Sequence, residues 1–182
     1  MDINDEVIIK RLREIDLKNE TLENLNRYQE TTRIKYISNG KILEKDESFI
    51  DEWDKDRKID IVKYLVELIN RQGIVIGAYI EKKLIGFVSI ESEFFGSKNQ
   101  YLELTFAHVS RDYRGLGIGK KLIDKSKKES LSKGAKKLYL GTHPSIESQG
   151  FYKKIGCVLA EEINKEVYHR EPLDLQLELI LY

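Results

Sequence analysis

The sequence predicts an α/β protein in which helices cover both faces of a mixed β-sheet. Two apolar runs in the middle of the chain, residues 74–80 and 84–90, flank a charged turn and predict a β-hairpin. After residue 100, strand-like and helix-like segments alternate. A glycine-rich turn at residues 115–119 joins one of these strands to a helix, which is typical of phosphate-binding α/β proteins.

The first half of the chain is expected to supply one strand, two helices and a polar connection. Leu22, Leu25, Tyr28 and Thr32 recur at helical spacing, and this recurrence predicts a helix over residues 17–36. A polar, acidic segment with the single tryptophan, Trp53, follows it. The predicted order is a strand (7–12), a helix (17–36), the polar segment (39–58) and a second amphipathic helix (59–71).

The second half is expected to complete the sheet. The predicted order is strands 74–80, 84–90 and 100–109, helix 118–133, strand 137–141, helix 146–155, and strands 158–163 and 173–182. Neither an internal repeat nor a low-complexity linker divides the chain. We therefore expect residues 1–182 to form a single domain.

Composition and charge exclude several functional classes. The chain has 31 Lys plus Arg and 31 Asp plus Glu, so no net field favours nucleic acid or an anionic membrane. The first six residues do not resemble a signal peptide, and no segment reaches the about 18 apolar residues of a membrane span. The single cysteine, Cys157, excludes an internal disulfide. We expect a cytoplasmic protein, for which a homodimer remains open.

The stretch from Arg114 to Lys120, Arg-Gly-Leu-Gly-Ile-Gly-Lys, is the most informative motif. Glycines let backbone N–H groups approach an anion without interference from a Cβ atom. The helix that begins at this turn adds unpaired N–H donors and the positive end of its dipole. The motif therefore predicts an anion site, most simply for a pyrophosphate.

Three phosphate-binding patterns can be compared with this turn. The P-loop pattern fails because Lys121, and not Ser or Thr, follows Lys120. The dinucleotide pattern Gly-x-Gly-x-x-Gly fails because the third glycine, Gly119, comes one residue early. The pattern Arg/Gln-x-x-Gly-x-Gly/Ala fits Arg114, Gly117 and Gly119.

This third pattern resembles the acyl-CoA-binding turn of the GNAT superfamily of N-acetyltransferases. Residues 109–115 look like the lead-in to that turn, although Arg111 stands where the family often has Pro. Residues 151–157 resemble the family's Phe-Tyr-x-x-x-Gly-Phe segment, with Cys157 in place of the final Phe. The resemblance covers roughly residues 70–160 and implies a central, mostly antiparallel sheet in which strands 100–109 and 137–141 splay apart.

The resemblance also implies acetyl-CoA as co-substrate. Its pantetheine arm would pair with strand backbone, and its pyrophosphate would lie on the glycine turn. Ser145 stands where the family frequently has Asn, so it keeps a hydroxyl but lacks the amide. The residues expected to contact the cofactor are Val109, Arg114, Gly115, Leu116, Gly117, Ile118, Gly119, Lys120, Ser145 and Tyr152.

Acetyl transfer to an amine needs a base, because an alkyl ammonium with a pKa near ~10 must lose a proton before it attacks a thioester. Glu103 lies eleven residues before Arg114, the offset of the catalytic Glu in the histone-acetyltransferase branch of the superfamily. His108 is the second candidate, since its ordinary pKa suits a base near neutral pH. Strand alternation places these two side chains on opposite faces unless a bulge intervenes, so we treat them as alternatives.

Tyr152 is the expected general acid, because a Tyr at this place in the family often points at the cofactor sulfur. We predict no metal site, since His108, His143 and His169 are isolated in the sequence. The acidic residues between 44 and 56 would suit a cationic acceptor, either a small-molecule amine or a peptide amine. We therefore predict an acetyl-CoA-dependent N-acetyltransferase that works by direct attack in a ternary complex. Two alternatives remain open, namely a non-catalytic acyl-CoA-binding or protein-interaction module and an enzyme with a different acceptor or acyl chain.

Overall fold

A seven-stranded sheet forms the centre of the molecule in the computed structural model, which describes residues 6–182. The strand order is β1 (Val7–Arg11), β4 (Ile74–Ile80), β5 (Lys83–Phe95), β6 (Tyr101–Val109), β7 (Lys137–Thr142), β9 (Leu175–Ile180) and β8 (Val158–Leu159). Neighbouring strands are antiparallel except β6 and β7, which run parallel. The predicted mixed, mostly antiparallel sheet is confirmed. Residues 1–5 lie outside the described part, and they include most of the segment that was compared above with a signal peptide.

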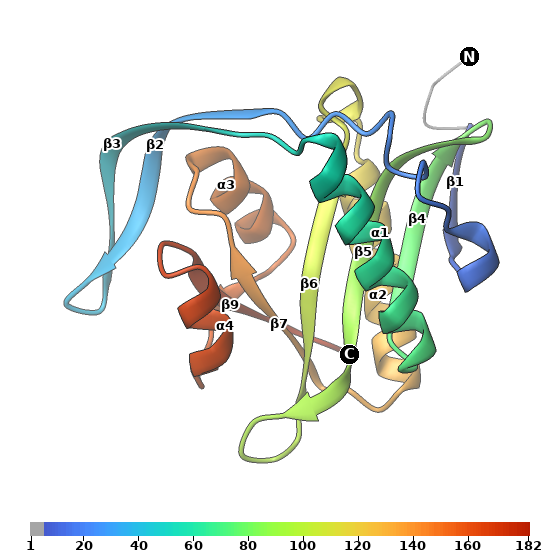
Figure 1. The fold of residues 1–182 in the computed structure, drawn as a ribbon. Coiled ribbons are helices and arrows are strands. Elements are labelled where there is room, and N and C mark those ends of the chain that lie inside the picture. The colour runs from blue at the N-terminus through green and yellow to red at the C-terminus, as the bar shows by residue number, and fades with distance from the viewer. Residues whose placement is uncertain (1–5) are drawn as a thin grey trace.

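The sheet opens between β6 and β7. The parallel ladder joins Tyr101, Leu102 and Glu103 to residues 137–139, and the pairing then ends. Beyond that point the two strands diverge, as Figure 1 shows. This divergence is the splay that the family resemblance implied, and it exposes the backbone of the second half of β6 towards the gap.

Two helices cover opposite faces of the sheet. Helix α1 (Lys55–Asn70) packs on β4 and β5 in front of the sheet in Figure 1, and α2 (Ile118–Ser132) packs on β4, β5 and β6 behind it. Strand β4 is apolar on both sides, because Ile76 belongs to the core under α2 and Val75 to the core under α1. None of the helices in residues 6–182 is both long and apolar enough to cross a membrane.

The helix predicted for residues 17–36 is wrong. This segment contains turns followed by strand β2 (Gln29–Ser38), which pairs with β3 (Lys41–Asp51) in a separate two-stranded sheet. The hairpin reaches beyond the main sheet in Figure 1. Asn39 and Gly40 form its turn with φ of 50° and 71°, and an Asn-Gly pair between segments of alternating apolar and polar residues is a strong hairpin signal. Leu22 and Leu25 are nevertheless buried in the core under α1.

Smaller differences concern the ends of elements. Helix α1 begins at Lys55 and not at residue 59, because the carboxylate of Asp54 accepts a hydrogen bond from the backbone N–H of Arg57 at 2.7 Å. Helix α3 (Ile146–Lys154) lies where it was predicted. The strand predicted for residues 158–163 shortens to β8, and a further short helix, α4 (Lys165–Arg170), precedes β9. The 3-10 turns Glu14–Asp16 and Arg111–Tyr113 complete the elements.

Candidate active site

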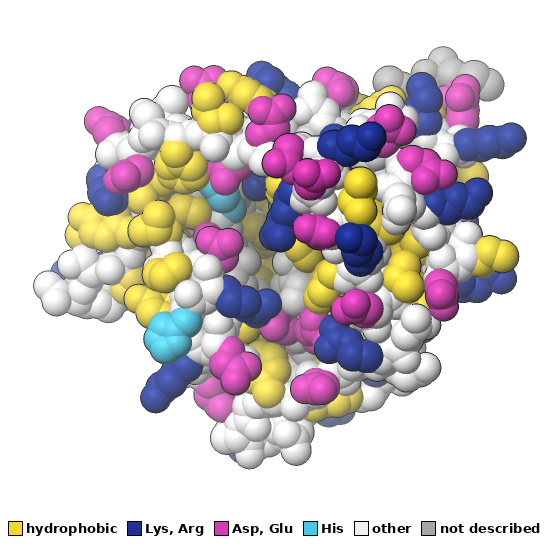
Figure 2. Space-filling view, in the orientation of Figure 1, with side chains coloured by type: hydrophobic (Ala, Val, Ile, Leu, Met, Phe, Trp, Pro, Cys, Tyr) yellow, Lys and Arg dark blue, Asp and Glu magenta, His cyan; other side chains and the backbone are white. Residues whose placement is uncertain are grey.

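Consecutive parts of β6 line two cavities. The larger, of about 1150 Å³, is lined by residues 107–109 of β6, the glycine turn, the start of α2, part of α3 and the start of β2. The smaller, of about 340 Å³, is lined by residues 103–106 of β6, by α1 and by the α4–β9 region. Figure 2 shows a hollow between the surface over α1 and that over α3 and α4, with acidic and basic side chains around it. The two cavities therefore give β6 two separate approaches.

The glycine turn forms a cradle of backbone donors in the larger cavity. Gly115 and Gly117 have left-handed φ values of 79° and 76°, and a Cβ atom at either would meet only open space. Gly117 is the N-cap of α2, and the first helical bond runs from Lys121 N–H to its carbonyl at 3.1 Å. The N–H groups of the first helical turn after Gly117 consequently lack intrahelical acceptors. Open space, free donors and a helix N-terminus fit a pyrophosphate.

Gly119 has a different role from the other two glycines. A Cβ atom at Gly119 would lie 3.2 Å from the ring of Phe151 on α3. The third glycine of the motif therefore lets α2 and α3 pack closely.

The two basic side chains of the motif are occupied within the protein. The Arg114 guanidinium donates to the carbonyls of Val109, Tyr28 and Arg27 at 3.0, 3.1 and 3.3 Å. Lys120 forms an exposed ion pair with Asp124 at 2.5 Å. Arg114 thus fixes the segment before β2 against the glycine turn, and the backbone is the main source of donors for an anion.

Tyr152 lies on α3 and lines the larger cavity. Within residues 6–182 its hydroxyl has no hydrogen-bond partner, while its ring packs edge-on against Phe151 at 5.3 Å. Burial raises the pKa of Tyr152, with a smaller contribution from Cys157. The hydroxyl therefore stays protonated near neutral pH and can donate a hydrogen bond into the cavity.

His108 also lines the larger cavity, but it sits in an aromatic cluster. Its ring packs edge-on against Trp53 at 4.6 Å and lies 5.8 and 6.1 Å from the rings of Phe106 and Phe87. Burial among these rings holds the pKa of His108 well below its usual range, and nearby guanidinium groups act in the same direction. A ring that stays neutral in this way is a weak proton acceptor.

Glu103 lies in the smaller cavity, where it forms an ion pair with Arg170 of α4. Burial raises the pKa of Glu103, and the Arg170 guanidinium lowers it in part. Glu103 does not line the cavity of Tyr152, and within the described residues it has no hydrogen bond to His108.

Strand alternation would place Glu103 and His108 on opposite faces unless a bulge intervenes, and β6 contains such a bulge. Ser89 of β5 pairs with Phe106 and Ile90 pairs with Leu104, so Thr105 is an extra residue in β6. Leu104 packs in the core under α2, whereas Phe106 packs on the α1 side. This bulge therefore brings Glu103 and His108 to the same face of the strand.

Ser145 is fully buried as the N-cap of α3 and does not line the larger cavity. Its hydroxyl oxygen accepts from the side chain of Gln29 at 2.9 Å and donates to the hydroxyl of Ser148 at 2.9 Å. The hydroxyl is used within the protein, so we leave Ser145 out of the contacts proposed below.

A buried arginine was missed by the sequence analysis. Arg27 is 8% exposed, and its guanidinium lies 5.6 Å from the Trp53 ring and donates to Gln29 at 3.2 Å. Its Nε atom is buried without a hydrogen-bond partner in the described chain. Arg27 acts electrostatically on Tyr152, on Asp51 and on Asp174, a cavity-lining carboxylate that was also missed. Its only sequence signal was an arginine inside a segment wrongly assigned to a helix.

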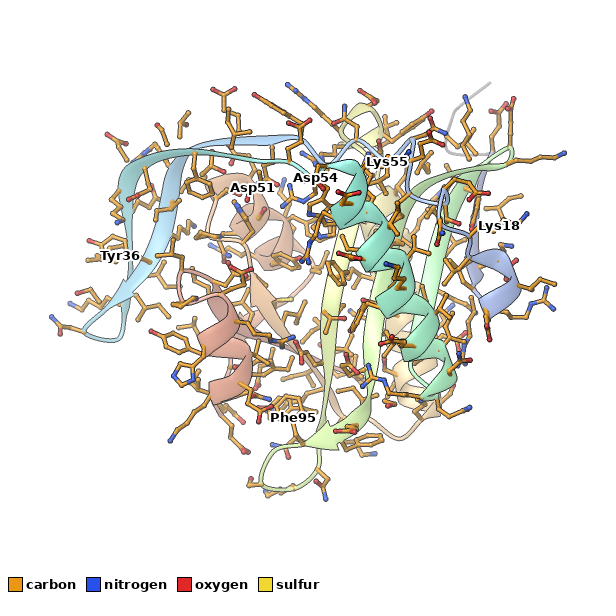
Figure 3. The ribbon with its side chains drawn as sticks, in the orientation of Figure 1. Lys18, Tyr36, Asp51, Asp54, Lys55 and Phe95 are labelled. Atoms are coloured by element: carbon orange, nitrogen blue, oxygen red, sulfur yellow. The ribbon has the colours of Figure 1, made fainter. Side chains whose placement is uncertain are left out.

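The β2–β3 hairpin is tied to this region by Asp51, the last residue of β3, which Figure 3 labels near α3. Its carboxylate lies 2.8 Å from Nε2 of His143, whose Nδ1 accepts from the backbone N–H of Ser145 at 3.2 Å. The ring is therefore neutral with its proton on Nε2, and it donates to Asp51. In residues 6–182, no three His, Cys, Asp or Glu side chains gather to hold a metal ion.

Comparisons with known proteins agree with this geometry. The sequence matches the model of the "Acetyltransferase (GNAT) family" over residues 38–157. No curated protein matches the sequence significantly. Similar solved structures include nourseothricin acetyltransferase (17% identity, TM-score 0.71, 97% of this chain and 99% of the other). They also include a candidate streptothricin acetyltransferase from Bacillus anthracis strain Ames with acetyl coenzyme A (20% identity, TM-score 0.67, 97% of this chain and 98% of the other). A third is aminoglycoside 6'-N-acetyltransferase with coenzyme A (20% identity, TM-score 0.54, 70% of this chain and 81% of the other).

Proposed function

The chain belongs to the GNAT acetyltransferase family, and from this premise we propose that it transfers the acetyl group of acetyl-CoA to a primary amine of a small cationic molecule, by direct attack in a ternary complex. The observation that carries the proposal is the arrangement along β6. A cradle of backbone donors lies in one cavity and a group of carboxylates lies in the other. The two substrates could then approach the splayed strand from different sides.

Acetyl-CoA would supply an acetyl thioester, and the larger cavity fits its parts. The backbone of Gly115, Leu116, Gly117, Ile118 and Gly119 would hold the pyrophosphate, because Gly115 and Gly117 leave open space above free N–H groups. Val109 would contribute the end of β6 next to the pantetheine arm. Lys120 lines the same cavity and would add positive charge, although it also pairs with Asp124.

Tyr152 would assist departure of the thiolate. Its hydroxyl is unpartnered within residues 6–182, lines the larger cavity and stays protonated because burial raises its pKa. A protonated hydroxyl can donate a hydrogen bond that stabilises the developing thiolate. His108 is less suited to proton transfer, since its pKa is held low in the aromatic cluster.

The acceptor would bind in the smaller cavity. Its lining includes four carboxyl groups and two arginines, so carboxylates outnumber cations; the carboxyl groups are those of Asp60, Glu103, Glu171 and Asp174. Nourseothricin, streptothricin and aminoglycoside acetyltransferases are among the similar structures. Both points favour an amine on a cationic antibiotic-like molecule.

A thiol-release screen with acetyl-CoA tests this function directly. Streptothricin, kanamycin, spermidine and a lysine-containing peptide would serve as acceptors, and calorimetry would measure CoA affinity independently. We expect thiol release with at least one cationic small molecule. CoA binding without thiol release for any amine would instead support a non-catalytic acyl-CoA-binding module.

A further inference from the structure

Asp174 is one of the four carboxyl groups that line the smaller cavity. It lies just before β9, where its backbone N–H donates to the carbonyl of Glu171 at 3.0 Å. Its side chain lines the cavity, and within residues 6–182 nothing donates a hydrogen bond to its carboxylate. By contrast, Glu103 in the same cavity is held by Arg170. Partial burial without a donor disfavours the ionised form of this carboxylate.

The position of Asp174 places it at the splay. A Cβ atom added to Gly141 of β7 would lie 3.8 Å from Oδ2 of Asp174 and 3.2 Å from Val167. The carboxylate therefore lies beside the part of β7 that has already separated from β6. Because Gly141 has no side chain, Val167 and the Asp174 carboxylate can approach β7 closely at this point.

Asp174 is also coupled to the other cavity. Its carboxylate raises the pKa of Tyr152, and the Arg27 guanidinium acts on both groups. The separation of these charges is thus short enough for them to influence one another across the splay. Asp174 consequently combines a place in the acceptor cavity with an electrostatic effect on Tyr152, the expected general acid.

We propose that Asp174, and not Glu103, accepts the proton of the acceptor ammonium. This inference rests on the proposed function, since it assigns a role within the same reaction. The geometry that carries it is an unpartnered carboxylate beside Gly141, in the cavity opposite the glycine cradle.

The electrostatic surroundings suit this role. Burial raises the pKa of Asp174 to about 7, the carboxyls of Glu171 and Asp51 add to the rise, and Arg27 opposes it. A base whose pKa lies near the working pH combines availability with proton affinity. The other charged or titratable groups around it are Tyr152 on α3, Arg57, Asp60 and Tyr64 on α1, Glu103 on β6, and Arg170 on α4.

The ammonium gives one proton to the Asp174 carboxylate, and the nitrogen lone pair then forms a C–N bond with the thioester carbonyl carbon. When the tetrahedral intermediate collapses, the C–S electron pair goes to sulfur. The second proton of the nitrogen reaches the thiolate with the help of Tyr152, and the proton on Asp174 is released to solvent. No oxidant or further co-reactant is required.

The test compares Asp174→Asn with two variants, using streptothricin as acceptor. The competing base is removed in Glu103→Gln, and Glu166→Gln removes an exposed α4 carboxylate that does not line the cavity. Asp174→Asn should lower kcat/KM by about 100-fold or more, as expected for loss of a general base. CoA affinity should remain within about twofold by calorimetry, and Glu166→Gln should behave as the wild type.

A second acceptor separates proton removal from structural damage. Hydroxylamine is mostly unprotonated at neutral pH, so it does not need a base to remove a proton before it attacks. With this acceptor, kcat/KM of Asp174→Asn should fall by less than about tenfold, after subtraction of the uncatalysed rate. Equal losses with both acceptors, or wild-type activity of Asp174→Asn with streptothricin, would overturn the assignment. If the wild type releases no thiol with any amine, the proposed function itself fails.

A measurement without turnover completes the test. Carbon-13 NMR of the free wild-type enzyme should show the Asp174 carboxyl titrating near pH 7, as its surroundings require. Titration near the ordinary value of an aspartate would contradict the proposal even if Asp174→Asn failed to fold.

Discussion

Arg170 of α4 holds the carboxylate of Glu103 by an ion pair at the edge of the smaller cavity. The Glu103 side chain is only 14% exposed, whereas that of Arg170 is 56% exposed. The guanidinium stabilises the ionised form of Glu103 and satisfies one of its oxygens. A carboxylate fixed in this way suits the binding of an ammonium better than the transfer of its proton.

Glu103→Gln should therefore affect binding more than chemistry. We expect KM for a cationic acceptor to rise by about three- to tenfold with little change in kcat, because the variant removes a charge present in both ground state and transition state. Steady-state kinetics with streptothricin would measure both constants, and Glu93→Gln, an exposed change on β5, would serve as control. A fall of about 100-fold in kcat would return the role of base to Glu103.

The glycine cradle gives a prediction with a matched control on the same helix. Gly117 and Gly134 flank α2, both have left-handed φ (76° and 96°), and a Cβ atom at either meets open space. Gly117→Asp and Gly134→Asp should therefore cost similar backbone strain, about 1–2 kcal/mol. Gly117→Asp alone should abolish CoA binding, because it places a carboxylate among the donors of the anion site.

Calorimetry with CoA and a thermal melt would check both variants. CoA affinity that survives in Gly117→Asp would remove the pyrophosphate from this turn. Loss of affinity in both variants alike would point to unfolding, and the melt would detect it.

Tyr152→Phe tests the group expected beside the sulfur. The ring packs on Phe151 and does not depend on its hydroxyl, which has no partner in the described chain. The variant should thus fold normally and bind CoA with nearly unchanged affinity, while kcat falls by about 10- to 100-fold. Tyr168→Phe, on the exposed surface of α4, should leave both quantities unchanged. Equal turnover of the Tyr152 variant and the wild type would remove this hydroxyl from the mechanism.

Elements could be predicted from the sequence where the local residue pattern favours the same secondary structure that tertiary packing requires. Ile74–Ile80 is strongly apolar and forms the strand predicted for it, and helix α2 begins where the glycine turn ends. Residues 29–38 were assigned wrongly because Tyr28 and Thr32 fit a helical spacing by chance. Pairing with β3 through the Asn-Gly turn decides their structure.

In the candidate site, too, the residues of a continuous motif could be predicted from sequence, whereas residues brought together by the tertiary fold could not. The anion cradle is a continuous motif, so residues 114–120 could be identified from sequence. Arg27 and Asp174 are 147 positions apart and carry no local motif. They influence each other electrostatically because the tertiary fold brings β2 against β9. The bulge at Thr105, which turns Glu103 and His108 to one face, likewise depends on pairing with β5.

The raised pKa of Asp174 leads to a prediction about the stability of the fold that does not depend on catalysis. Its pKa is about 7 in the folded protein against an ordinary value of 3.8, so the folded state favours the protonated form. The stability that this group contributes is present below pH 4 and is lost as the pH rises through 7. A shift of about three units corresponds to about 4 kcal/mol, which we reduce to about 2 kcal/mol because the carboxylate is partly accessible to solvent.

Asp174→Asn should therefore be more stable than the wild type at pH 8, and the difference should shrink by about 1 kcal/mol or more at pH 5.5. Urea denaturation at the two pH values measures it, with Glu166→Gln as the control for loss of a carboxylate as such. If the difference in free energy of unfolding between the variant and the wild type stays constant between pH 5.5 and pH 8, burial does not raise the pKa of Asp174. A variant that gains stability while it loses activity with streptothricin would show that the protein keeps a costly ionised carboxylate for its chemistry.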